Sequence, residues 1–371
     1  TSKFCAVGHF IFKRHNPNTR GLIMRFFKKI LPKTLSLFLT AALPLTVTVG
    51  YTEPAESQNG RPNPYRAIHG WAKLSEGRNW GSTAGIDIDP NGVHVWAIDR
   101  CGGNSCSDSN LDPILKFDQS GNVVTTFGAG LFNFPHGIHV DDEGNVWITD
   151  ARGPDENIPE SHGKGHTVVK FSPLGEVLMT MGTPGVAGKG AYNFDEPCDV
   201  VTGPNGEIFI ADGHFGQYPN APPDTTARII KYSKNGEFIK AWGKFGSAPG
   251  EFRTPHALAM DPQGRLVVGD RGNNRIQMFD LEGNFIKEWT NFSRPSGLHF
   301  GPNGLIYVAD SESNRLPWGH WGWEVGIRVG NLNTGSVVAL IGGSNPEGVA
   351  VDAAGNVYGA VVSFGGNLTR H

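Results

Sequence analysis

Residues 135–151 read PHGIHVDDEGNVWITDA, and residues 255–271 repeat the same pattern as PHALAMDPQGRLVVGDR. Each copy opens on Pro, alternates apolar and other residues, turns at a Gly-containing pair, and alternates again up to an Asp. Alternation with a period of two predicts strands, and a Gly-containing pair between two such runs predicts a tight turn. Each copy therefore predicts two antiparallel strands joined as a hairpin.

Four further copies follow the same pattern, and the six begin 40 to 62 residues apart. After the Asp of most copies come a loop and two more alternating runs, such as TVVKFS (167–172) and EVLMTMG (176–182). Four-stranded units at this period are typical of propeller blades, and a closed ring of them covers most free sheet edges. We therefore predict an all-β fold, a six-bladed β-propeller. The further copies begin at Thr83, Pro197, Pro295 and Pro346.

The composition agrees with short strands and many turns. Of 371 residues 51 are Gly, 38% are hydrophobic, and only 18% are charged, which excludes a coiled coil, a helical bundle and a collagen-like rod. The sixth copy reaches the last residue after about three strands, GNLTRH. The segment IHGWAKLSEGRNWG (68–81) resembles the missing outer strand, so we expect it to close the ring.

The N-terminal 50 residues differ from the rest, because they carry eight Lys or Arg and no acidic residue. From Met24 a basic stretch precedes an apolar run, as in a secretory signal. We expect residues 1–23 to be upstream translation, 24–52 a signal peptide, and 60–371 one propeller domain. The chain is then secreted or periplasmic.

The remaining 24 basic and 35 acidic residues give the chain beyond residue 50 a net charge of −11. Phosphate contacts need clustered cations, so a nucleic-acid partner is not expected. Nor is an anionic membrane surface expected after signal cleavage. We expect a monomer acting on a small-molecule or peptide substrate.

Three cysteines follow the signal region. Cys101 and Cys106 lie in a glycine-rich loop, RCGGNSCSDSN, and an oxidising compartment would favour a disulfide between them. The alternatives are two free thiols or a metal site. A metal site would need further ligands, and the sequence shows none nearby. Cys198 is expected to be unpaired and buried.

The first strand of each blade lines the central channel of a propeller, so the residues after each opening Pro should ring one channel mouth. Blades two, four and six supply His136, His256 and Glu347. Two His and one carboxylate suit catalytic zinc or another divalent transition metal. The alternative is that Pro-His merely starts a strand. The other blades supply small side chains: Ala84, Cys198 and Ser296.

A second ring follows the Asp that ends each second strand. Arg100 and Arg271 would flank the metal and suit a substrate carboxylate or an oxyanion, although Arg271 could instead make a surface salt bridge. His139 and His299 fall inside first strands and are expected to be packing or surface residues. The recurring aspartates are expected to be structural, because five blades share them: Asp99, Asp150, Asp212, Asp270 and Asp310.

These units, including IADGHFG (210–216), resemble the NHL-repeat propeller of peptidyl-α-hydroxyglycine α-amidating lyase over about residues 81–358. That family splits a C–N bond to give a peptide amide and glyoxylate, using zinc, a tyrosine base, two arginines and a calcium ion. The resemblance implies that His136 and His256 hold zinc and that Arg100 and Arg271 assist. It places the calcium carbonyls at Ile86 and Ile138.

The sequence departs from that family at several of these positions. Glu347 stands where the family has its third zinc histidine, and Gly348 where it has the calcium aspartate. Asn345 replaces a methionine, and His214 replaces the tyrosine, with Tyr218 four residues later. His could act as a base near neutral pH.

Three functions are therefore expected as alternatives. The first is a metal-dependent lyase of the amidating type, in which His214 or Tyr218 takes a proton. The second is a metal-dependent hydrolase of an ester or lactone, in which the metal activates water. The third is a non-catalytic NHL propeller that binds a peptide or a carbohydrate.

Overall fold

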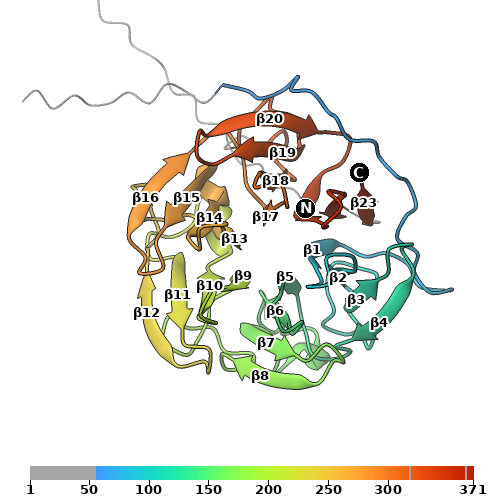
Figure 1. The fold of residues 1–371 in the computed structure, drawn as a ribbon. Coiled ribbons are helices and arrows are strands. Elements are labelled where there is room, and N and C mark those ends of the chain that lie inside the picture. Colours follow the sequence, from blue (N-terminus) through green and yellow to red (C-terminus); the bar gives the residue numbers. More distant parts are fainter. Residues whose placement is uncertain (1–55, 317–318, 364–365) are drawn as a thin grey trace, which may run out of the picture. The chain divides into compact units, whose positions relative to one another are not determined.

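The computed structural model describes residues 56–371 except 317–318 and 364–365. The predicted upstream segment and signal peptide lie outside these residues. The described chain forms six antiparallel sheets arranged as a ring, five of four strands and one of three (Figure 1). The predicted six-bladed all-β propeller is therefore confirmed.

The blades follow one another along the chain. Their strands are β1 (Thr83–Ile88), β2 (Val95–Asp99), β3 (Ile114–Phe117) and β4 (Val123–Phe127); β5 (Pro135–Val140), β6 (Val146–Asp150), β7 (Thr167–Phe171) and β8 (Val177–Met181); β9 (Pro197–Thr202), β10 (Ile208–Asp212), β11 (Arg228–Tyr232) and β12 (Phe238–Trp242); β13 (Pro255–Met260), β14 (Leu266–Asp270), β15 (Arg275–Phe279) and β16 (Phe285–Trp289); β17 (Gly297–Phe300), β18 (Ile306–Asp310), β19 (Gly326–Asn331) and β20 (Ser336–Ile341); β21 (Pro346–Val351), β22 (Val357–Val361) and β23 (Leu368–Arg370).

The first strand of each blade faces the ring axis. These strands contact one another in the order β1, β5, β9, β13, β17 and β21, and β21 returns to β1. The apolar residues of each blade pack against the next blade; Trp96 and Ile98 of β2, for example, share a buried cluster with Ile148 of β6. Burial between neighbouring sheets is the main apolar stabilisation of such a ring.

In the first four blades the recurring aspartate accepts the backbone N–H two residues before the first strand. Asp310 of the fifth blade instead accepts the backbone N–H of Ser313 and pairs with Arg328. Pro135 pairs with Asp150, and the buried Asp150 carboxylate accepts hydrogen bonds from the backbone N–H of Asn133 at 2.9 Å and of Phe134 at 2.6 Å. Asp270 accepts the backbone N–H of Arg253 at 2.9 Å in the same way. The hairpin thus brings the residue after Pro and the residue after Asp to one face, as predicted, and the structural role of the aspartates is confirmed.

The segment before β1 runs along the outside of the last blades and the first one (Figure 1). Ile68 forms a bridge with Arg370 at the edge of β23, and Lys73 pairs with Asn122 next to β4. Trp71 is buried between the two blades, with its ring 4.9 Å from that of Tyr358. The segment 68–81 does close the ring, but it does so through single bridges and a Trp anchor rather than as a regular fourth strand.

In the part of the chain that the structure describes, three short 3-10 helices interrupt the loops: Pro159–Ser161, Phe215–Gln217 and Arg271–Asn273. No helical segment within the described residues has the length and hydropathy of a membrane span. Cys101 and Cys106 form a disulfide, and Cys198 is free and buried, as predicted.

Candidate metal centre

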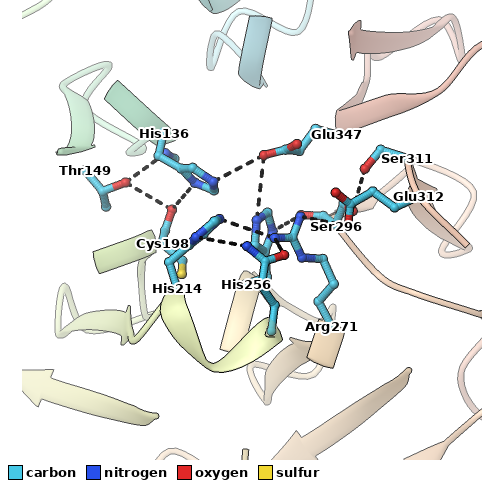
Figure 2. Close-up of polar contacts among 12 residues, drawn as sticks. His136, Thr149, Cys198, His214, His256, Arg271, Ser296, Ser311, Glu312 and Glu347 are labelled. Carbon is cyan, nitrogen blue, oxygen red and sulfur yellow. Dashed lines mark hydrogen bonds and ion pairs between the residues drawn. The ribbon is translucent and has the colours of Figure 1, made fainter. Parts of the chain in front are cut away.

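His136, His256 and Glu347 meet on the channel axis, as the repeat predicts (Figure 2). Each is the second residue of a channel strand, in β5, β13 and β21, and each is buried. The imidazole centroids of the two histidines lie 4.7 Å apart. Oε1 of Glu347 lies 3.2 Å from Nε2 of His136 and 3.7 Å from Nε2 of His256.

The hydrogen bonds of the two histidines fix where their protons are. Nδ1 of His136 lies 2.8 Å from the carbonyl oxygen of Cys198, and Nδ1 of His256 lies 2.7 Å from that of Ser296. A carbonyl only accepts, so each Nδ1 carries the proton and each Nε2 has a lone pair. Metal-binding histidines are commonly anchored through the other ring nitrogen in this way.

Three electron pairs consequently point at one another. Nε2 of His136 and Nε2 of His256 are buried without a hydrogen-bond partner, and both face the Glu347 carboxylate. Burial lowers the pKa of His136, and it lowers that of His256 well below the usual value. Although burial opposes it, the interactions with His136 and then with Arg271 and Arg100 lower the pKa of Glu347 to about 2. Neutral imidazoles around an ionised carboxylate suit a divalent cation.

His214 joins this cluster from the loop after β10. Ligand-capable nitrogens of His136, His214 and His256 all lie within 4.8 Å of one another. The His214 ring is 5.0 Å from that of His136 and 5.3 Å from that of His256. Its pKa is held well below the usual value by burial first and then by the charges of its neighbours. His214 is therefore neutral at pH 7.

The nitrogens of His214 have different surroundings from those of the other two histidines. Its Nδ1 lies 3.3 Å from the amide nitrogen of Gln217, and its Nε2 lies 3.3 Å from Nη2 of Arg271. Both neighbours are donors, so if His214 directed its lone pair at a metal, one of these donors would have no acceptor. The set His136, His256 and Glu347 therefore fits a metal better than three histidines do.

Arg100 and Arg271 lie beside this centre and are buried. Arg100 donates through Nε to the carbonyl of Pro135 and through Nη1 to Asn104, while its Nη2 has no partner. Nε of Arg271 is also buried without a partner. Burial lowers the pKa of Arg100 to about 10, so it stays charged at pH 7. These open donors fit an anionic group near the axis.

Other predicted residues lie elsewhere or stay predictions. The side chain of Tyr218 is 42% exposed and packs on Phe215, with ring centroids 5.2 Å apart. Ile86 and Ile138 are buried and line the channel. A side chain at Gly348 would meet the carbonyl oxygen of Ala84 at 2.7 Å. The calcium prediction remains untested, and no step below depends on it.

The sequence reasoning missed three groups near the centre. Gln217 and Arg294 contact Arg271, and Arg294 is fully buried. The guanidinium of Arg152 lies 3.8 Å from the ring centre of Phe134, beside Arg100 at 3.6 Å from the same ring. The only signal in the sequence was that Arg152 and Gln217 lie in long loops after the blade aspartates, and Arg294 gave no such signal because it directly precedes Pro295.

The channel forms a cavity of about 530 Å³. Its lining includes the three candidate metal ligands and also His139 and His299, which were expected to be packing or surface residues. Both histidines instead face Asp87: His139 Nδ1 lies 3.4 Å from Oδ2, and His299 Nδ1 lies 3.8 Å from Oδ1. Ring closure brings them together, which their separate positions in the sequence did not indicate.

Comparison with known proteins gives the family. The NHL repeat model matches residues 252–279 and 292–316, and the model "Strictosidine synthase-like, N-terminal" matches residues 331–370. NHL repeat-containing protein 3 of Mus musculus is 32% identical over 263 residues, which are 68% of this chain and 68% of the mouse protein. The chain therefore belongs to the NHL-repeat family of β-propellers.

Proteins named for amidation are also similar to this chain. Peptidyl-glycine alpha-amidating monooxygenase A of Xenopus laevis is 32% identical over 272 residues, 64% of this chain and 27% of the frog protein. Peptidyl-alpha-hydroxyglycine alpha-amidating lyase 1 of Drosophila melanogaster is 34% identical over 185 residues, 46% of this chain and 30% of the fly protein. The chain thus spans less than a third of these two relatives.

A solved gluconolactonase from Xanthomonas campestris shares the fold, with a TM-score of 0.53 and 13% identity over 79% of this chain and 86% of that one. At that identity the likeness concerns the fold alone.

Proposed function

We propose that this chain is a divalent-metal-dependent propeller enzyme of the amidating-lyase type, which cleaves a C–N bond in a carboxylate-bearing hydroxyglycine peptide. The observation that carries the proposal is the pair of partnerless Nε2 atoms on His136 and His256, which both face the Glu347 carboxylate. Relatives 34% and 29% identical to this chain are named amidating lyases.

His136, His256 and Glu347 would hold the metal, with zinc as the first choice because two imidazoles and a carboxylate suit it. A bound metal would polarise a hydroxyl and lower its pKa. Arg100 and Arg271 offer partnerless donors next to these three residues, so they would bind and orient a substrate carboxylate. The disulfide at Cys101–Cys106, after Arg100, supports the secreted or periplasmic location that we also propose.

The test combines metal content with product formation. The purified chain should hold about one zinc or other divalent transition metal and release glyoxylate from a hydroxyglycine peptide, and a chelator should abolish the release. Full metal loading without glyoxylate release would reject the lyase; hydrolysis of esters or lactones in a parallel panel would then identify the hydrolase. A chain that binds no metal after incubation with zinc would reject both enzyme hypotheses.

A further inference from the structure

His214 is placed between two hydrogen-bond donors. Nε2 of Gln217 faces its Nδ1, and Nη2 of Arg271 faces its Nε2, each at 3.3 Å. A neutral imidazole has one lone pair and one N–H. It can therefore accept a hydrogen bond from only one of the two donors, and its own N–H must point at the other.

The orientation of the Gln217 amide is fixed by two arginines. Its Oε1 accepts Nη2 of Arg271 at 2.7 Å and Nη2 of Arg294 at 3.4 Å. Arg294 is itself held by the carbonyl of Arg271 at 2.9 Å and by Glu312 at 3.0 Å. Because the amide oxygen takes both guanidinium groups, the amide N–H must be the side turned toward His214.

The position of the His214 proton follows from which of the two neighbouring donors has another acceptor. Nη2 of Arg271 already donates to Gln217, whereas His214 is the only acceptor that the described residues offer to the Gln217 amide nitrogen. Nδ1 of His214 then carries the lone pair, and Nε2 carries the proton. Two donors, His214 Nε2–H and Arg271 Nη2–H, consequently face each other.

Facing donors mark a site for a negatively charged oxygen, as facing lone pairs mark one for a cation. We propose that Gln217 holds neutral His214 with its proton on Nε2, and that His214 and Arg271 together donate hydrogen bonds to an oxygen of a substrate carboxylate or of a developing oxyanion. The substrate class rests on the proposed function, whereas the proton position does not. His214 then acts as a hydrogen-bond donor and not as a metal ligand or a base.

The proton position is tested on the metal-free protein. Histidine-selective ¹⁵N labelling and long-range ¹H–¹⁵N correlation spectra report which ring nitrogen carries the proton, with H214F identifying the signal. We expect His214 to be neutral at pH 7 with an unprotonated Nδ1. Gln217→Glu offers an acceptor to Nδ1–H and should reverse the tautomer, whereas the control Gln263→Glu, which alters an exposed turn amide that also accepts from an arginine, should not. A protonated Nδ1 in the unaltered chain would overturn the proposal.

The donor role is tested by titrating glyoxylate, the expected product, into the zinc-loaded protein. H214F and Q217E should each raise the dissociation constant for glyoxylate about tenfold, as expected for one lost hydrogen bond to a charged acceptor. Zinc content should be unchanged in both variants. Unchanged glyoxylate affinity, or loss of zinc in H214F, would overturn the donor role. If neither the unaltered chain nor any variant binds zinc, the proposed function fails. The tautomer measurement still decides the proton position in that case.

Discussion

The channel contains two clusters of two histidines and one carboxylate, and they differ in how their hydrogen bonds are used. In the first, His136 and His256 keep Nε2 atoms without a partner beside Glu347. In the second, both oxygens of Asp87 face His139 and His299, and most polar atoms are used. Two contacts show this: Asp87 Oδ2 accepts the backbone N–H of Val140 at 2.7 Å, and His139 Nε2 lies 2.8 Å from the hydroxyl of Thr202.

The difference separates a binding site from a structural clamp. The Asp87 cluster ties blade one to blade two through its own partners and needs no ligand. The Glu347 cluster keeps buried acceptors that no described group of the protein satisfies. An unsatisfied buried polar group costs stability unless something binds there, so the Glu347 cluster is the one expected to bind a ligand.

The largest expected effect separates the two clusters by metal affinity. His136→Ala should reduce bound zinc from about one per chain to near zero, because it removes one of three protein ligands. His139→Ala removes a histidine from the same channel and should leave zinc content unchanged. Zinc content per chain after dialysis, measured by elemental analysis, gives the result. Equal zinc loss in both variants would contradict the assignment of one cluster to metal and the other to structure.

The second effect concerns stability without metal, where both carboxylates should matter but for different reasons. Asp87→Asn replaces an acceptor with a donor near the Val140 N–H and the two histidines, and should destabilise the fold by about 2 kcal/mol. Glu347→Gln removes a charge that the fold favours, since the pKa of Glu347 is lowered to about 2, and it leaves Arg100 and Arg271 without this carboxylate. It should therefore destabilise the metal-free protein at pH 7 by about 2 kcal/mol, and the difference should disappear as the pH falls through 2. Urea unfolding of chelator-treated proteins measures both. Stabilisation by E347Q at pH 7 would show that the cost of burying the carboxylate exceeds its interactions with His136, Arg271 and Arg100.

The two clusters also show which parts of the channel could be predicted from the sequence. His136, His256 and Glu347 were predictable because each repeats at the same position after Pro in alternate blades, so the ring brings them to one axis. Asp87, His139 and His299 occupy one shared position deeper in their strands, but the blades that carry them are not evenly spaced. A polar residue at the same position of three apolar strands was the available signal.

The contacts of His214 could not be predicted from the repeat. Its position depends on the short helix Phe215–Gln217 inside an irregular loop, where no periodicity fixes which side chains meet. The same holds for Arg294, whose partners Glu312, Arg271 and Gln217 lie in three other loops. Regular strands carry positional information in the sequence, whereas loop contacts depend on tertiary packing that the sequence pattern does not encode.

The smallest expected effect compares two glutamates beside channel-strand prolines. Glu347 follows Pro346 and has a lowered pKa, whereas the pKa of Glu196, which precedes Pro197, is raised to about 7 by burial and by the nearby Asp195. A raised pKa means that the folded chain binds the proton more tightly than the unfolded chain. The stabilisation from Glu196 is therefore complete below about pH 4.5 and is lost as the pH rises through 7.

Glu196→Gln removes this titration and should make the protein more stable than the unaltered chain at pH 8, by on the order of 1 kcal/mol relative to the difference at pH 5. Urea unfolding at the two pH values, with equal m-values, measures it. The exposed Glu237→Gln serves as the control and should shift both values equally. The same pH dependence in E196Q as in the unaltered chain would mean that Glu196 is ionised in the folded protein at both pH values, with a pKa close to that of the unfolded chain. In that case the pKa of Glu196 would not be raised relative to that of the unfolded chain. The positive charge of Arg152 would then offset the effect of burial at Glu196.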